Sequence, residues 1–227
     1  MYQHVFDENR QTDMRNCFLN ELAPLGMLRH YSKRDEINQS FIGQAVAIVV
    51  DGKVCKSILS STGQQRLLYT LRPGEMIGEM SLMCGGNLGY QLRAKEDSDI
   101  SFVGLDALNK ALEAKPSIYR HLLNSVTRKN RILLLQLTGA TFNNAYGSIA
   151  DALLRLAACS DTMDSKWAPD TISTSFTQAE LAHNTGCSRV TVTRVLNRFV
   201  EEKIISIRDR RIVIHDIAAL TAYTDTV

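Results

Sequence analysis

The chain has 227 residues, of which 44% are hydrophobic and 22% charged, and its 26 basic and 24 acidic side chains leave a formal net charge of +2. This length allows one large domain or two small ones, and the composition excludes a disordered tail. No apolar run approaches the roughly 18 residues of a membrane span, so we expect no membrane partner. The first residues show no basic stretch followed by an apolar one, so no secretory signal is expected.

The five cysteines are scattered and form no CxxC pair. This pattern argues against a disulfide framework, a thiolate zinc site and a CxxC redox centre. No two of the five histidines have metal-ligand spacing. We therefore expect a reducing, cytoplasmic location, with no metal and no other cofactor.

Residues 35–104 predict antiparallel β-structure, because short apolar stretches alternate with turn signals. The apolar stretch 45–50 runs into Asp51-Gly52, which predicts a two-residue hairpin turn, and further turn signals stand at 61–64 and at Pro73-Gly74. Strands at this regular spacing predict a barrel or jelly roll. Cupin enzymes share that architecture, but they need clustered histidine and carboxylate ligands, and residues 32–119 contain no histidine.

A long helix is predicted after Pro116, because residues 117–142 contain no glycine or proline until Gly139. Apolar side chains recur there at helical spacing, at Tyr119, Leu122, Val126, Leu133, Leu137 and Ala140. The second half is apolar on more than one face, which favours two neighbours: the β-domain and the same helix of a second chain. The alternative is an ordinary core helix.

Asn143-Asn144 predict a break and an N-cap, followed by an amphipathic helix that carries Ile149, Leu153, Leu156 and Ala157. Residues 160–175 read as a surface loop or irregular hairpin.

Two short helices are predicted next. Thr177 and Glu180 form a capping-box pair, with Phe176 as its hydrophobic staple, and Gly186 suits a left-handed C-cap. Ser188 then caps a second helix through about Glu202, whose inward side chains are Val192, Val195, Leu196 and Phe199. Two helices joined by a tight glycine turn indicate a helix-turn-helix, and residues 204–214 predict a β-hairpin wing with its turn at 208–210.

Local charge points to DNA as the partner. Residues 189–211 carry seven basic and three acidic side chains, a net charge of +4, which suits phosphate contact. The N-terminal half of a recognition helix is the part that reaches base edges. The expected DNA contacts are Thr177, Gln178, Ser188, Arg189, Val190, Thr191, Thr193, Arg194, Arg198, Arg208 and Arg210. The alternative is a winged module used only for protein contacts.

This order of elements resembles the CRP/FNR superfamily of bacterial transcription regulators. Residues 186–194 (GCSRVTVTR) resemble its recognition-helix signature, and Gly78-Glu79-Met80-Ser81 resembles the start of its cyclic-nucleotide cassette; the likeness covers residues 14–220. It implies an α+β fold in which an effector-sensing, cyclic-nucleotide-binding-type β jelly roll precedes a long dimerisation helix and a winged helix-turn-helix.

The resemblance also implies domain boundaries. Residues 1–111 would be the sensing domain, 112–142 the dimerisation helix and hinge, and 143–227 the DNA-binding domain. A homodimer would form through 112–142, a small-molecule effector would reorient the DNA-binding domains about 141–144, and RNA polymerase would be a further partner. The alternative of an enzyme, a barrel domain with a regulatory tail, is not expected, because no nucleophile–base pair or metal cluster appears in the sequence.

The cassette departs from the nucleotide-binding members, which continue to an Arg-Ser or Arg-Thr pair that neutralises the cyclic phosphate. With the family's downstream strand aligned on 92–95, those positions hold Leu88 and Gly89, and a phosphate there would be left unpaired. The positions that meet the purine fall on Leu133 and Leu134. We therefore expect an apolar or aromatic effector rather than cAMP, with Arg93 as an alternative anion ligand. The expected effector residues are Gly78, Glu79, Met80, Ser81, Leu88, Gly89, Tyr90 and Leu133.

Other branches of the family fit less well. Only Cys17 precedes Cys55, which excludes the three-cysteine N-terminal cluster of the iron–sulfur oxygen sensors, and a haem-binding member would need His30 or His121 as axial ligand. Two alternatives remain: a ligand-independent regulator and a thiol-redox regulator that uses Cys17 or Cys84.

The recognition helix predicts the DNA sequence that is read. Many members carry glutamate where this chain has Val190, and the pattern Val-Thr-Val-Thr-Arg is similar to regulators of halorespiration that respond to chlorinated phenols. Val190 suits the C5-methyl group of thymine, whereas Arg194 suits guanine or a phosphate. We expect a palindromic, A/T-rich site with half-sites about one helical turn apart.

Overall fold

The structure is a computed structural model of the chain. It describes residues 7–40, 43–61, 65–86, 89–158, 172–174, 177–208 and 211–224. The described residues form two compact units that divide inside one long helix, between Ile132 and Leu133. None of the helices in these ranges is long and apolar enough to cross a membrane.

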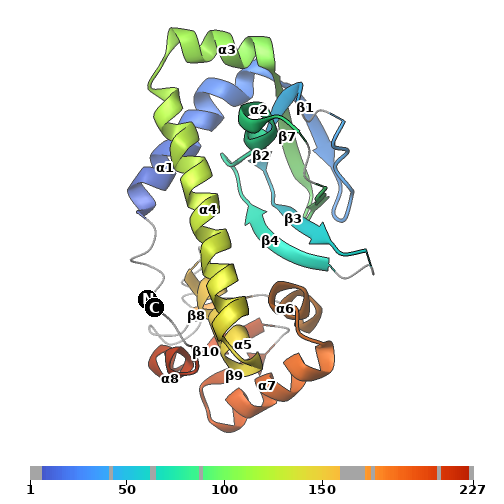
Figure 1. Ribbon diagram of the computed structural model, residues 1–227, viewed down its shortest axis with the longest axis vertical. Helices are drawn as coiled ribbons and strands as arrows, with labels where there is room; N and C mark the ends of the chain where they lie inside the picture. The colour runs from blue at the N-terminus through green and yellow to red at the C-terminus, as the bar shows by residue number, and fades with distance from the viewer. Residues whose placement is uncertain are drawn as a thin grey trace. The chain divides into compact units, whose positions relative to one another are not determined.

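The first unit contains two antiparallel sheets, as predicted (Figure 1). One sheet has the strand order β1 (Met27–Tyr31), β7 (Ser98–Gly104), β2 (Ala45–Asp51) and β5 (Met76–Ile77). The other has the order β4 (Gln65–Leu71), β3 (Val54–Leu59) and β6 (Gln91–Ala94). Strands that are neighbours in the sequence therefore do not always pair.

The hairpin predicted at Asp51-Gly52 is wrong. The strand before it, β2, pairs with β5 and β7, whereas the strand after it, β3, pairs with β4 and β6. Gly52 has a φ of 77°, and a Cβ atom there would collide with the Asp97 carbonyl. The glycine thus serves the passage of the chain from one sheet to the other. The turn at Pro73-Gly74 is confirmed, with a φ of 80° at Gly74.

Helices complete the core of this unit. They are α1 (Glu8–Cys17), the π-helical turn η2 (Phe18–Leu22), the 3₁₀ turn η3 (Ala23–Leu25), α2 (Glu79–Cys84), α3 (Leu105–Ala114) and the first half of α4 (Ile118–Phe142). Met14 and Phe18 are fully buried against Val46 and Ile48. The sequence did not predict α1 or η2.

The long helix predicted after Pro116 is confirmed as α4, whereas the implied range 112–142 also includes the end of α3. Residues up to Ala114 belong to α3, and the turn containing Pro116 separates it from α4. The sequence places Tyr119 and Leu122 on one apolar face of this helix, but the structure separates them. Leu122 is 3% exposed and belongs to the core, whereas Tyr119 and Leu123 are 53% and 66% exposed.

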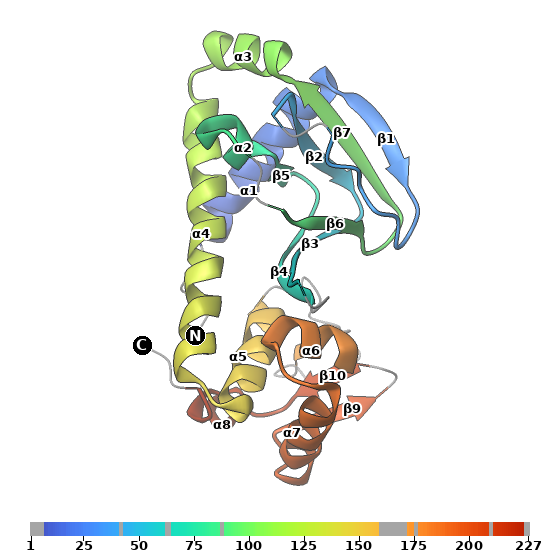
Figure 2. The same cartoon turned by 45° about the vertical axis from the view of Figure 1, so that its right-hand side comes forward.

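The second unit is a winged helix-turn-helix (Figure 2). After the second half of α4 it contains α5 (Ala145–Ala158), β8 (Ile172–Thr174), α6 (Gln178–Thr185), α7 (Arg189–Glu201), β9 (Ile205–Arg208), β10 (Arg211–Ile214) and α8 (Ile217–Ala222). Asn144 caps α5, as predicted, because its Oδ1 accepts a hydrogen bond from Gly147 N at 3.1 Å. The wing has a third strand: β8, inside the predicted loop 160–175, pairs with β10.

Candidate functional site

The helix-turn-helix forms where its local signals predict. The Thr177 hydroxyl accepts a hydrogen bond from Glu180 N at 3.1 Å, and the Glu180 carboxylate accepts one from Thr177 N at 2.8 Å, so the capping box is confirmed. Gly186 has a φ of 72° at the C-cap of α6. The Ser188 hydroxyl caps α7. Phe176, the expected staple, lies outside the described residues.

Helix α7 has one buried and one exposed face. Its predicted inward side chains, Val192, Val195, Leu196 and Phe199, are all fully buried. On the opposite face, Val190 is 79% exposed, and Arg194 and Asn197 lie one and two turns further along. With Tyr146 and other α7 residues they line a hollow of about 560 Å³. This exposure leaves Val190 available for contact with a partner.

Two predicted contact residues fix the orientation of α7. The Thr193 hydroxyl lies 2.9 Å from the side-chain oxygen of Gln178, the first residue of α6, and 3.0 Å from the carbonyl oxygen of Arg189. These interactions join the start of α6 to the first turns of α7. Thr193 and Gln178 therefore position α7, and they lie near the N-terminal end of this helix, which is the end expected to contact DNA.

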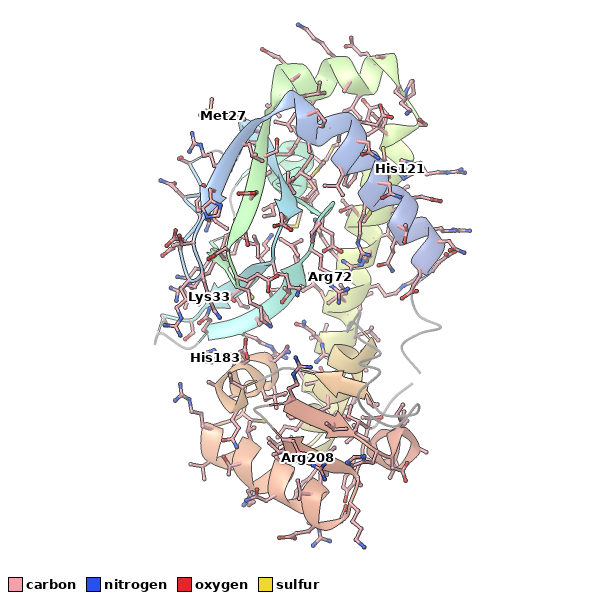
Figure 3. All side chains as sticks on the ribbon, turned by 180° about the vertical axis from the view of Figure 1, so that it is seen from behind. Met27, Lys33, Arg72, His121, His183 and Arg208 are labelled. Atoms are coloured by element: carbon pink, nitrogen blue, oxygen red, sulfur yellow. The ribbon has the colours of Figure 1, made fainter. Side chains whose placement is uncertain are left out.

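The remaining predicted contacts are placed as follows. Arg189, Ser188 and Thr177 are exposed at the helix starts, whereas Thr191 is half-buried. Arg208 ends β9 in the wing (Figure 3), and Arg210 lies outside the described residues.

Arg198 is already engaged within α7 and its C-cap. Its Nε donates to Glu202 at 2.6 Å, and this bond raises the pKa of Arg198. The same carboxylate also accepts a hydrogen bond from the Tyr223 hydroxyl, so Glu202 joins α7 to the residue that follows α8. Sequence reasoning missed Asn197, although its spacing of seven residues from Val190 places both on one helix face.

In the first unit, the cassette residue Glu79 is inside the protein. It is the first residue of α2, is 5% exposed, and forms a salt bridge with Lys129 of α4. The Lys129 ammonium also donates to the carbonyl oxygen of Met76 at 2.7 Å. Gly78, which precedes the helix, has a φ of 102°.

The other expected effector residues are only partly brought together with Glu79. Tyr90 is 9% exposed, but Met80 is 46% exposed and Gly89 is also exposed. Leu88 lies outside the described residues, and Leu133 belongs to the second compact unit. Arg93, the alternative anion ligand, is exposed on β6, whereas its neighbours in that strand, Leu92 and Ala94, are buried.

A second lysine lies beside this pair, and sequence reasoning missed it. Lys56 of β3 pairs in register with Tyr69 of β4 and Leu92 of β6, and is 7% exposed. Its ammonium nitrogen lies 3.7 Å from the centroid of the Tyr90 ring and 5.7 Å from that of Tyr69. Among the described residues it has no hydrogen-bond acceptor, but its nitrogen is not one of the fully buried side-chain atoms that lack a partner.

The charges around Lys56 explain its titration. The pKa of Lys56 is lowered from the ordinary 10.5 to about 8, because burial and, to a lesser extent, the positive charge of Lys129 lower it more than the negative charge of Glu79 raises it. Burial also raises the pKa of Tyr90 to about 12, so this phenol stays neutral. The interior thus holds Lys56, Lys129 and Glu79, and also Glu75, which pairs with Arg15 and Arg128, so it is less apolar than the sequence predicts.

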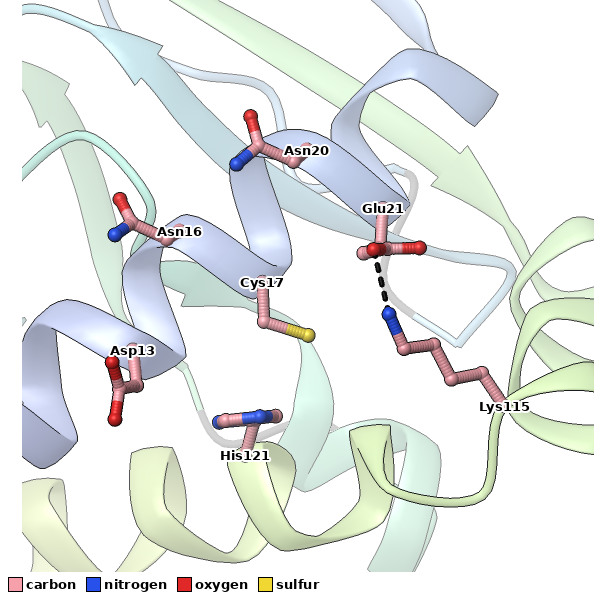
Figure 4. A pocket seen from close by; sticks show the side chains of 7 residues that line it. All are labelled: Asp13, Asn16, Cys17, Asn20, Glu21, Lys115 and His121. Carbon is pink, nitrogen blue, oxygen red and sulfur yellow. Dashed lines mark hydrogen bonds and ion pairs between the residues drawn. The ribbon is translucent and has the colours of Figure 1, made fainter.

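A polar cavity of about 370 Å³ lies between the N-terminal helical segment and the start of α4 (Figure 4). It is lined by Asp13, Asn16, Cys17, Asn20, Glu21, Lys115 and His121. Burial raises the pKa of the Cys17 thiol despite the opposing charge of Lys115, which disfavours the reactive thiolate.

The candidate haem ligands and metal ligands remain dispersed. The His30 ring is exposed and lies 2.8 Å from an oxygen of Asp99, whereas His121 lines the cavity beside Cys17. Within the described ranges, no three His, Cys, Asp or Glu side chains gather in a way that could hold a metal ion.

These features define a protein with a two-sheet β-domain, a long helix and a winged helix-turn-helix. The family model of the cyclic nucleotide-binding domain matches residues 28–115, and that of the Crp-like helix-turn-helix domain matches residues 148–223. The "Cyclic AMP receptor protein" of Thermus thermophilus is 30% identical over 182 residues, which cover 80% of each chain. The "cAMP-activated global transcriptional regulator CRP" of Salmonella typhimurium is 27% identical over 188 residues, which cover 82% of this chain and 88% of the relative.

Solved structures show the same fold. FixK2 from Bradyrhizobium japonicum has a TM-score of 0.74 at 19% identity, over 89% of this chain and 98% of its own. CprK complexed with OCPA has a TM-score of 0.68 at 18% identity, over 88% and 92%. The chain belongs to the CRP/FNR superfamily, and it is a DNA-binding transcription regulator rather than an enzyme.

Proposed function

We propose that the protein acts as a homodimer that reads a palindromic, A/T-rich DNA site and responds to a small aromatic effector other than cAMP. The observation that carries the DNA part is the exposed face of α7, on which an almost uncovered Val190 precedes Arg194 by one turn. A valine methyl group suits the C5-methyl of thymine, and an arginine suits guanine or a phosphate.

Helix α4 supplies the proposed dimer contact. Large apolar side chains remain exposed along it at Tyr119, Leu123, Val126, Leu134 and Leu137. Tyr119, Leu123 and Val126 are spaced by four and three residues, and Leu134 and Leu137 by three, as in the heptad seam of two helices that pack in parallel. Val126 and Leu134 are eight residues apart, with the exposed Asn130 midway between them, and a single asparagine in such a seam sets the register of a two-stranded coiled coil. A second copy of the same helix therefore fits this face.

The effector part rests on the cassette. The relatives are named for cAMP, yet Leu88 and Gly89 stand where the alignment puts the phosphate-binding pair, and the exposed Arg93 offers no replacement. An aromatic effector that needs no such pair fits the buried Tyr69 and Tyr90 better. RNA polymerase at the promoter and a cytoplasmic location complete the proposal.

Selection of DNA from a random pool tests the proposal. The purified dimer is used alone, with aromatic acids, and with cyclic nucleotides. We expect an A/T-rich palindrome enriched with the aromatic acids. Enrichment only with cyclic nucleotides would overturn the effector part, and enrichment without any ligand would favour the ligand-independent regulator.

Variants then separate base reading from phosphate contact. Arg194→Ala should lower affinity for the selected site about tenfold to a hundredfold and relax the preference at one base pair. Arg208→Ala should weaken all sequences alike and reduce the salt slope by about 1. Lys110→Ala, which removes an exposed charge from α3, is the control. Equal effects of Arg194→Ala on random and selected DNA would refute its base contact.

A further inference from the structure

We propose that Asn197 is a further base-reading residue of α7 and that it selects an adenine in each half-site of the DNA. This inference rests on the proposed function, in which Val190 and Arg194 contact the DNA, and it names one more base pair that the protein reads. The three side chains follow one another at spacings of four and three residues, so they share one exposed face of the helix. At a rise of 1.5 Å per residue, Asn197 lies about 10 Å along the axis from Val190.

The polar side chains along this part of α7 fall into two groups. Thr193 and Arg198 are hydrogen-bonded within the protein, to the start of α6 and to the C-cap of α7. Arg194 and Asn197 are exposed, and their side chains make no hydrogen bond or ion pair with any other described residue. The carboxamide of Asn197 therefore offers its N–H donors and its carbonyl oxygen to a partner.

A structural role does not account for an asparagine at this position. Asn197 lies more than one turn from either end of α7, so it caps neither end. Asparagine is among the weaker helix formers, because its side chain competes for backbone hydrogen bonds in other conformations. Among the described residues, no backbone group compensates by bonding to its side chain. An alanine or a glutamate at this solvated position would favour the helix more.

The space beside Asn197 is bounded by packed side chains. The three residues of the exposed face line the hollow of about 560 Å³ together with Tyr146 of α5. The Tyr146 ring packs edge-on against Phe199 and is stacked with Tyr223, with ring centroids 6.2 and 6.0 Å apart. These contacts hold Tyr146 in place, so the hollow is a fixed feature that leaves room for a base edge at the carboxamide.

The chemistry of the side chain favours adenine. A carboxamide can donate to N7 of adenine and accept from its N6 amino group, whereas guanine presents two acceptors at the same places. A phosphate is a poorer partner at this end of α7, because the exposed carboxylates of Glu201 and Glu202 outnumber the single cation Arg198. We therefore assign Asn197 to a base edge and not to the DNA backbone.

Parallel DNA selections with full-length wild type and Asn197→Ala test this assignment, under the ligand condition in which the wild type enriches a site. We expect one adenine in each half-site to lose its enrichment in Asn197→Ala. That adenine should lie within about three base pairs of the position whose preference is lost in Val190→Ala. Asn197→Gln, which keeps the same donor and acceptor, should keep the adenine.

Modified DNA distinguishes a base contact from a general loss of affinity. Replacing the selected adenines by 7-deazaadenine removes N7 and keeps Watson–Crick pairing. In fluorescence anisotropy the wild type should lose at least about threefold in affinity, whereas Asn197→Ala, already weakened at least about fivefold, should lose nothing further. Asn109→Ala, which removes an exposed asparagine from α3, is the matched control and should behave as the wild type.

The outcomes separate this inference from the proposed function. No enriched sequence for the wild type would overturn DNA reading by α7 as a whole, and the role of Asn197 with it. An enriched site in which no position changes its preference in Asn197→Ala would overturn the role of Asn197 alone. An equal loss of affinity by Asn197→Ala for selected and random DNA would also overturn it, and base reading by Val190 and Arg194 would stand.

Discussion

Replacing the buried lysine with an uncharged side chain of similar length should stabilise the effector-free protein. A pKa of about 8 in the folded state, against 10.5 for an ordinary lysine, means that burying the Lys56 charge costs about 3 kcal/mol at pH 7. Lys56→Met removes this cost, and a methionine thioether packs well against the Tyr90 and Tyr69 rings. Urea unfolding at pH 7 should therefore show a variant that is more stable by about 3 kcal/mol.

The stabilisation should depend on pH with a defined sign. Below pH 8 both folded and unfolded wild type carry the ammonium, so the full cost is present. Between pH 8 and 10.5 the unfolded chain binds more protons, so wild-type stability rises relative to the variant. The difference should fall from about 3 kcal/mol at pH 7 to about 1.5 kcal/mol at pH 9.5. A variant less stable at pH 7, or a gap that does not narrow, would refute the reasoning; Lys53→Met should change stability by under about 1 kcal/mol at both values.

Three further predictions concern the helices. Leu122→Ala should lower the free energy of unfolding by about 2–5 kcal/mol, because it opens a cavity in the core, whereas Leu123→Ala should weaken dimerisation and leave monomer stability nearly unchanged. Urea unfolding measures the first effect and sedimentation equilibrium the second. The reverse pattern would contradict the assignment of the buried and exposed faces of α4. Asn130→Val should tighten the dimer in sedimentation experiments yet weaken binding to the selected DNA in fluorescence anisotropy, because the register of the two α4 helices is no longer fixed. Tighter DNA binding by this variant would contradict the role proposed for Asn130. Thr177→Ala should cost about 1 kcal/mol in thermal unfolding, since it breaks the capping box of α6, and an unchanged melting temperature would show that tertiary contacts alone define the helix start.

The helix-turn-helix could be predicted closely because its signals are local. Thr177, Ser188 and Gly186 each act on backbone groups within a few residues, so the helix boundaries are encoded where they occur. The buried face of α7 follows from spacing alone. By contrast, α1 is polar apart from Met14 and Cys17, and it is held by distant partners, such as the salt bridge of Arg15 with Glu75 at 3.0 Å. No short window of the sequence contains that information.

The sheets show a similar limit. The strands were found, but Asp51-Gly52 was assigned to a hairpin because its turn chemistry is local, whereas pairing is not. The two partners of β2 are β5 and β7, and both lie well beyond the next strand in the sequence. Lys56 could not be assigned to the interior for the same reason, since the face of a strand depends on register and a slip of one residue reverses it.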